Sequence, residues 1–210
     1  MTSRKIQILR RYTDLPALIH LLRSKQVTLL SPTTWDDRND RHYMEVFKQR
    51  KKLKALLALC FSEAGETYHH WKVFAPGSSG VCIEFNKAAL IAALPKADFT
   101  HSKMDYRTIA DLSASNLLVK DLPFTKRHAF GDEREYRIVY ASKITDVATQ
   151  TFPISISTIR RVILNPWVPE PLYEAVWKTL NSIDNCGSLS ITKSRLIESE
   201  QWKELAGEYA

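Results

Sequence analysis

The stretch Asp132-Glu133-Arg134-Glu135-Tyr136-Arg137-Ile138-Val139-Tyr140 places two glutamates directly before an aromatic and β-branched run. Residues of the second kind favour strands, so the later half of the stretch predicts a strand. Because strand side chains alternate between faces, Glu133, Glu135 and Arg137 are expected to share one face. Such a row can supply a general base or hold a ligand hydroxyl, since neighbouring carboxylates raise each other's pKa and an arginine lowers it. The alternative is a solvated edge strand, whose charges discourage pairing with other strands.

The composition is that of an ordinary folded protein. The chain has 210 residues, of which 44% are hydrophobic and 25% charged, which argues against global disorder. Its apolar runs are shorter than the roughly 20 residues of a membrane span, and its first residues lack a secretory signal, so we expect a cytoplasmic protein with no membrane partner. Three cysteines without close spacing (Cys60, Cys82 and Cys186) argue against a disulfide framework or a zinc site, and no metal is expected.

The net charge of +7 favours anionic partners, such as a nucleotide or nucleic acid. The cations are densest between residues 48 and 54. The candidate nucleic-acid-binding residues there are Lys48, Arg50, Lys51, Lys52 and Lys54. The alternative is a solvated helix end, where cations interact favourably with the helix dipole.

Apolar alternation and helical spacing predict strands and helices that do not follow a strict βαβ order. Strands are expected near residues 5–12, 27–31, 56–62, 81–85, 99–106, 136–140, 147–156, 159–164 and 189–192, with helices between them. The nearly continuous apolar run from Leu56 to Ser62 indicates a strand buried on both faces, whose polar end is well placed to face a cleft. The mixture predicts an α+β fold in a single domain of residues 1–210.

Two further features are ambiguous in the sequence alone. The loop around Asp36, Asp37 and Asp40 can hold a hard cation, but it lacks the length and glycine of a calcium hand, so helix capping by Asn39 or Asp40 is favoured. In the predicted helix 66–75, Tyr68 and Trp71 share a face. They either pack in the core or form an aromatic shelf for a planar ring.

Several stretches follow one another along the chain in an order that is informative as a set. They are Arg11-Tyr12, Ser31 to Asp40, Cys60 to Glu63, Trp71, Gly80 to Phe85, and Lys126 before Glu133 to Arg137. Taken in this order, they resemble a bacterial family called domain-of-unknown-function family 2971. The resemblance covers roughly residues 6–165 and leaves residues 166–210 as a C-terminal extension. Many members carry a Phe-Asn-Asp-Pro loop where this chain has Trp35-Asp36-Asp37-Arg38.

The layout of these pieces is similar to the ADP-ribosyltransferase fold. That resemblance implies a mixed or split central β-sheet flanked by helices, with NAD as the cofactor. An arginine would pair with the pyrophosphate of NAD, a serine would order the ribose-binding strand, and an aromatic would stack on nicotinamide. By position, the implied cofactor-binding residues are Arg11, Tyr12, Ser62, Tyr68 or Trp71, and Arg137.

The same resemblance implies that Glu135 and Glu133 are catalytic, because a carboxylate can bond the ribose hydroxyl and stabilise an oxocarbenium ion. The expected function is therefore an NAD-using ADP-ribosyltransferase-like enzyme of a defence or toxin system, acting on nucleic acid or protein. Two alternatives are open. One is a non-catalytic regulatory module that binds nucleic acid or nucleotides. The other is a purely structural role, in which the acidic row only pairs with Arg11, Lys126 or Arg127 and closes the sheet.

Overall fold

The computed structural model of the protein describes residues 6–207. The strands are β1 (Ile8–Asp14), β2 (Gln26–Leu30), β3 (Ala55–Ser62), β4 (Gly80–Asn86), β5 (Phe99–Lys103), β6 (Asp105–Arg107), β7 (Thr125–Arg127), β8 (Glu135–Ser142), β9 (Thr149–Pro153), β10 (Ile159–Leu164) and β11 (Ile191–Lys193). The α-helices are α1 (Leu15–Ser24), α2 (Arg38–Lys51), α3 (Tyr68–Phe74), α4 (Lys87–Ala92), α5 (Ile109–Ala114), α6 (Glu170–Asn181) and α7 (Glu200–Gly207). Four short 3-10 helices, η1 (Pro32–Thr34), η2 (Val119–Phe124), η3 (His128–Glu133) and η4 (Ile156–Thr158), complete the list.

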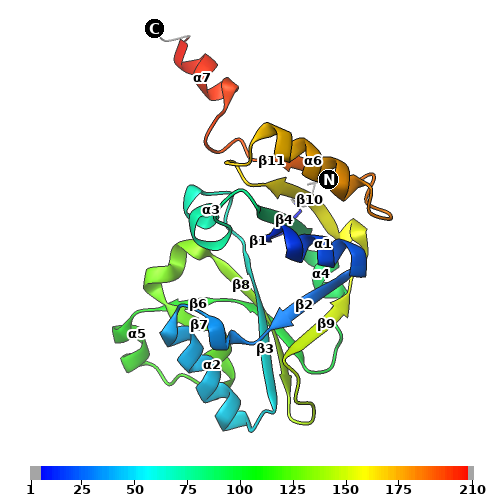
Figure 1. The fold of residues 1–210 in the computed structure, drawn as a ribbon. Coiled ribbons are helices and arrows are strands. Elements are labelled where there is room, and N and C mark those ends of the chain that lie inside the picture. Colours follow the sequence, from blue (N-terminus) through cyan, green and yellow to red (C-terminus); the bar gives the residue numbers. More distant parts are fainter. Residues whose placement is uncertain (1–5, 208–210) are drawn as a thin grey trace, which may run out of the picture.

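The described strands form one mixed, largely antiparallel sheet of nine strands and a separate parallel pair, β6 and β7. The main path runs β11-β10-β4-β1-β3-β2-β9, while β8 pairs with β3 and β5. Within the main sheet, the β10–β11 pair is parallel and the others are antiparallel. Helices flank this sheet, and α7 lies apart from the rest (Figure 1). The predicted α+β class with a mixed sheet between helices is confirmed.

The sheet divides at β3. One edge of β3 pairs with β8 along its whole length, from Ala55 opposite Ser142 to Ser62 opposite Glu135. The other edge meets β2 at Leu30 opposite Ala58, and β1 at Arg10 opposite Ser62. Three strands that are distant in sequence therefore meet at Ser62.

The burial of β3 explains its continuous apolar sequence. Leu57 and Leu59 face the main hydrophobic core, which α1 and α4 cover, while Leu56 and Ala58 face a smaller core with Met44 of α2. Because both faces of the strand are covered by protein, an alternating polar pattern would bury polar groups without partners.

The cap of helix α2 lies two or three residues earlier than the sequence suggested. We predicted Asn39 or Asp40 as the cap, but Asp37 Oδ1 accepts from the backbone N–H of Asn39 at 2.9 Å and of Asp40 at 3.3 Å. An aspartate at this position satisfies helix donors that have no partner within the helix. The Asp40 side chain is thereby left for another partner, described below.

Other boundaries also differ from the prediction. The start of the expected strand 5–12, at Lys5, lies outside the described residues, and β1 continues to Asp14. The expected strand 99–106 is divided at Met104, whose backbone N–H bonds to Glu135, so that β5 joins the main sheet and β6 joins β7. Among residues 6–207 no helix has both the length and the apolar character that membrane crossing demands.

Candidate active site

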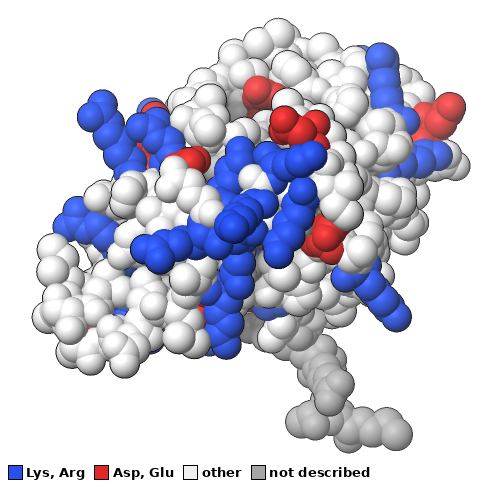
Figure 2. Space-filling view, turned by 90° about the horizontal axis from the view of Figure 1, so that it is seen from below, with Lys and Arg blue, Asp and Glu red and all other residues white. Residues whose placement is uncertain are grey.

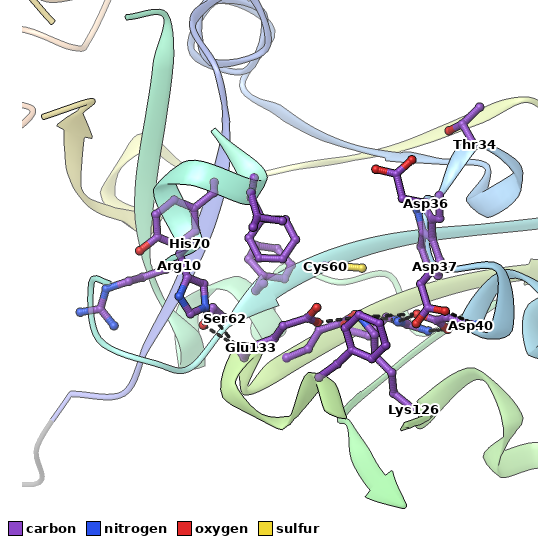
Figure 3. Close-up of a pocket in the computed structure, with 18 residues that line it drawn as sticks. Arg10, Thr34, Asp36, Asp37, Asp40, Cys60, Ser62, His70, Lys126 and Glu133 are labelled. Atoms are coloured by element: carbon purple, nitrogen blue, oxygen red, sulfur yellow. Dashed lines mark hydrogen bonds and ion pairs between the residues drawn. The ribbon is translucent and has the colours of Figure 1, made fainter. Parts of the chain in front are cut away.

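A cleft of about 430 Å³ opens where β3 ends and β8 begins. This volume falls within the roughly 300–1,000 Å³ typical of small-molecule sites. Asp36, Asp37 and Asp40 lie on one side of it, and Arg10, Ser62 and His70 on the other (Figure 3). The ionisable lining consists of the carboxylates Asp36, Asp37, Asp40, Glu133 and Glu135, the cations Arg10, Lys126 and Arg137, and His70. The aromatic lining consists of Tyr12, Trp35, Phe61, Phe74 and Phe130.

Glu133 and Glu135 come together through a turn rather than along one strand. Glu133 is the last residue of η3, Arg134 adopts a left-handed conformation with φ 44°, and β8 begins at Glu135. Lys126 Nζ then donates to Glu133 Oε2 at 2.6 Å and to Glu135 Oε2 at 3.2 Å. The predicted strand through Glu133 is therefore wrong, although the two carboxylates do lie side by side.

Arg137 is a fully buried organising residue of the cleft. Its Nη1 and Nη2 donate to both oxygens of Asp40, at 2.9 and 2.6 Å, and its Nε donates to Glu135 Oε1 at 2.7 Å. Nη1 also bonds the carbonyl of Pro123, and the guanidinium lies 4.6 Å from the Trp35 ring centroid. These contacts occupy the N–H groups of the guanidinium. Arg137 is therefore placed to position the two carboxylates rather than to bind a cofactor phosphate directly.

The environment separates the acidities of the two glutamates. Burial by itself raises the pKa of Glu135, but the adjacent Arg137 and Lys126 outweigh it and bring the pKa to about 2. Burial raises the pKa of Glu133 above its ordinary value, against the opposing effect of Lys126. Glu135 is therefore the permanently charged member of the pair, and Glu133 is the member that exchanges protons more readily, as in sites where two carboxylates have different roles.

The lowered pKa of Glu135 makes stability depend on pH. Its ionised form is favoured by folding, so the stabilisation is complete above about pH 4.5 and is lost as the pH falls toward about 2, a loss of about 3 kcal/mol. Denaturant titrations across this range should show the free energy of unfolding falling with pH. Glu135→Gln should flatten that slope, whereas Glu174→Gln, at an exposed site, should leave it unchanged. If the free energy of unfolding depended on pH equally in the wild type and both variants, the lowered pKa would not belong to Glu135.

Ser62 orders the backbone around the cleft. Its Oγ donates to the Glu133 carbonyl at 2.6 Å and accepts from the Ala64 N–H at 3.0 Å. The ring of His70 approaches the same hydroxyl, with Nε2 at 3.1 Å. Burial lowers the pKa of His70, which favours the neutral ring. Ser62 therefore ties the end of β3 to the turn that carries Glu133.

The remaining predicted cofactor-binding residues are only partly gathered here. Arg10 and Tyr12 line the cleft. Arg11 lies on the opposite face of β1, because strand side chains alternate, and burial lowers its pKa to about 10. Tyr12 stacks on His70 with ring centroids 5.3 Å apart.

The predicted aromatic shelf is not at the cleft. Trp71 is fully buried in a third hydrophobic core, with Ala75, Cys82 and Ile163, and its Nε1 donates to Glu66, so the core-packing interpretation holds for this residue. Tyr68 is 55% exposed and packs edge-on against Trp167. The planar walls of the cleft come instead from Tyr12, Trp35, Phe61, Phe74 and Phe130, which share no single motif.

Sequence reasoning missed the roles of Arg10, His70 and Asp40. The signals were present but weak: an Arg-Arg pair at residues 10–11, a His-His pair at 69–70, and an aspartate in a loop read as a cap. Each of these roles depends on a contact between segments distant in sequence, such as the 97 residues separating Arg137 from Asp40. Lys126, by contrast, was named as a possible ion-pair partner of the acidic row, and it lies only 7 residues before Glu133.

The basic run lies away from the cleft. Arg50, Lys51, Lys52 and Lys54 are exposed at the C-terminal end of α2, and Lys48 is half-buried. Figure 2 shows lysine and arginine side chains gathered on the face of the molecule seen from below, toward which this end of α2 points in Figure 1. Asp40 in the first turn and Lys51 at the last are separated by about 16 Å of helix.

The part of the chain that the structure covers contains no group of three or more His, Cys, Asp or Glu side chains arranged to hold a metal ion. The three loop aspartates illustrate why. Asp37 caps α2 and Asp40 binds Arg137, so their oxygens converge on protein donors rather than on one another.

Comparison with known proteins gives a match to a protein family and distant similarities to solved structures. Residues 70–138 match the family described as "Protein of unknown function (DUF2971)", which confirms the resemblance over the segment that carries Glu133, Glu135 and Arg137. A search of curated proteins gave no match.

Among solved structures, the chain is similar to Thermus sp. 2.9 DarT in complex with carba-NAD+, with a TM-score of 0.47 and 11% identity over 92% of this chain and 98% of that chain. It is likewise similar to the same protein in complex with ADP-ribosylated ssDNA, with a TM-score of 0.48 and 12% identity over 93% and 97% of the two chains. These values describe a distant similarity in the path of the backbone.

Proposed function

We propose that the cleft binds NAD+ and that the protein is an ADP-ribosyltransferase-like enzyme. The observation that supports this most directly is the charge of the lining, in which five carboxylates face three cations. Burial favours the neutral form of the only lining histidine, His70, so the imbalance remains near neutral pH. A cleft of this charge and with aromatic walls suits a planar, positively charged group.

The nicotinamide half of NAD+ is such a group. Its ring is a cationic pyridinium, and when the bond between ribose C1′ and the ring nitrogen breaks, the bonding electrons pass to nicotinamide and positive charge develops on the ribose. Carboxylates stabilise that oxocarbenium-like charge, as they do in glycoside cleavage. The acidic cleft therefore matches both the bound cofactor and the transition state.

The two glutamates take different roles in this proposal. Both oxygens of Glu135 are engaged, by Arg137 and Lys126, so Glu135 supplies fixed negative charge and positions its neighbours. Glu133 bonds Lys126 through Oε2, and its Oε1 has no hydrogen-bond partner among residues 6–207. That oxygen can accept from a ribose hydroxyl or take the proton of the acceptor nucleophile as it bonds to C1′.

The test measures the turnover of NAD+ and compares the affinities for NAD+ and NADH, whose rings differ in charge. Purified protein incubated with NAD+ and mixed protein and nucleic-acid acceptors should release nicotinamide, measured by liquid chromatography, in step with transfer of labelled ADP-ribose. NADH, whose ring is uncharged, should bind at least about tenfold more weakly than NAD+ in calorimetry, since each 1.4 kcal/mol of charge interaction is tenfold. Equal affinities, or no affinity for either, would contradict the proposal.

A non-catalytic module that binds nucleic acid is the second candidate. The exposed cations at the end of α2 favour it, because none of Arg50, Lys51, Lys52 and Lys54 forms an ion pair within the described part of the chain. Such a module has no affinity for NAD+, so the same calorimetric titration separates the two candidates.

A further inference from the structure

Beside the cleft, three arginines converge on one buried carboxylate. Glu84, on β4, is fully buried. Arg10 donates to its Oε1 through Nε at 3.0 Å, and Arg10 Nη2 forms an ion pair with the same oxygen at 2.9 Å. Arg160 Nη1 and Arg161 Nε donate to its Oε2, at 2.7 and 3.1 Å. We call Arg10, Arg160 and Arg161 with Glu84 the arginine cluster.

The convergence of Arg160 and Arg161 requires a local irregularity in β10. Consecutive residues of a regular strand point to opposite faces, so only one of two neighbours can reach the same carboxylate. The pairing of β10 with β4 shifts its register between Ile159 and Arg161. A bulge of this kind redirects a side chain at the cost of regular pairing, and such bulges occur often beside functional sites.

The positive charge of the three arginines exceeds the negative charge of Glu84. One guanidinium neutralises one carboxylate, and here there are three. A second carboxylate, Glu66, acts together with Glu84 and Arg10 on the thiol of Cys82, and it accepts from Trp71 and Ser194. Counting it still leaves three cations against two anions.

The unused donors of the cluster face outward. The side chains of Arg160 and Arg161 are 48% and 37% exposed, and each makes one hydrogen bond within the described residues. A guanidinium has five N–H donors in a planar fork, so most of them remain available at the surface.

We propose that the arginine cluster is a phosphate-binding site. The buried carboxylate of Glu84 holds the three guanidinium groups together. The free N–H donors of Arg160 and Arg161 bind the oxygens of a phosphate ester. Arginine forks match phosphate geometry in pairs of parallel hydrogen bonds, which a lysine does not reproduce. The phosphate belongs either to a nucleotide or to the backbone of a nucleic acid strand.

The cluster lies within reach of a ligand in the cleft. Arg10 belongs to both sites, because it lines the cleft and bonds Glu84. Strand order places β10, β4, β1 and β3 side by side, so Arg161 and Ser62 are separated by three strand spacings, about 14 Å. The site does not rest on NAD chemistry, since phosphate binding is measured independently of turnover.

The test compares two double variants that lose equal charge. Arg160→Gln/Arg161→Gln removes the outward forks, and Lys178→Gln/Arg195→Gln removes two exposed cations elsewhere. Binding of AMP is measured by calorimetry, and binding of a fluorescein-labelled single-stranded oligothymidylate by anisotropy at several salt concentrations, on the full chain. The cluster variant should bind at least one probe at least about tenfold more weakly, and the control should stay within about twofold.

The two probes identify the source of the phosphate. Loss of AMP binding indicates a nucleotide site, whereas loss of oligothymidylate binding, with a salt slope reduced by about 0.7 per lost contact, indicates a strand backbone. Similar losses in both variants, or none in the cluster variant, would overturn the proposal. If the double variant does not fold, Arg160→Gln alone removes the more exposed fork and leaves Arg10 and Arg161 on Glu84, and it should still weaken binding.

Discussion

Replacing Arg137 by Met should lower the free energy of unfolding by about 3–5 kcal/mol, the usual cost of removing one partner from a buried ionic network. The substitution keeps much of the side-chain volume but leaves Asp40 without its fork and Glu135 with Lys126 alone. Both carboxylates are nearly fully buried, so water cannot replace the lost donors. Urea denaturation followed by circular dichroism measures the change.

An exposed ion pair provides the control for this experiment. Arg107 pairs with Asp105 at 2.8 Å, with the two side chains 41% and 53% exposed. Exposed pairs contribute about 0–1 kcal/mol, so Arg107→Met should change stability by less than that. Arg137→Lys keeps the charge without the fork and should fall between the two. A loss at Arg137 no larger than at Arg107 would show that the buried network does not hold the two carboxylates in place.

Replacing Glu133 by Gln should reduce the rate of ADP-ribosyl transfer by about 10²–10⁴-fold, the usual contribution of a general base. The amide keeps a carbonyl oxygen for Lys126 but cannot accept the acceptor's proton. The effect should appear in kcat more than in KM, and the rise of activity with pH should disappear. Kinetic measurements of nicotinamide release across pH, with melting temperatures to verify folding, test this result.

Asp36→Asn serves as the matched control for Glu133→Gln. Asp36 also lines the cleft and is exposed, so its replacement removes the same charge without touching the glutamate pair. Its effect should stay below about tenfold. If Glu133→Gln retains the wild-type rate, or if both variants lose activity equally, Glu133 is not the proton acceptor.

The fold class and the location of the cleft could be predicted from local patterns. The apolar run of β3 has no polar residue until Ser62, which indicates burial on both faces and a polar end. The aromatic and β-branched run in β8 identifies a second strand, whereas its pairing with β3 is seen only in the structure. These patterns are informative because the covering of a strand by protein directly determines which residue types it tolerates.

Which face of β1 points toward the cleft could not be predicted in the same way. Leu9 faces the main core while Tyr12 packs against the third core, which contains Trp71, so protein lies on both sides of the strand. Alternation then shows that Arg10 and Arg11 point to opposite faces but not which one meets the cleft. The turn at Arg134 and the pairing of Arg137 with Asp40 depend on long-range contacts that no local pattern reports.

Lys126 has a consequence for the selectivity of the cleft. It sits on β7 of the small sheet and touches Asp40, Glu133 and Glu135 at once. A positively charged ligand of the kind proposed would share these three acids with the ammonium group of Lys126. Charge attraction at this position would therefore be divided between two cations, so a flat ring in contact with the aromatic walls would contribute to affinity as much as its charge.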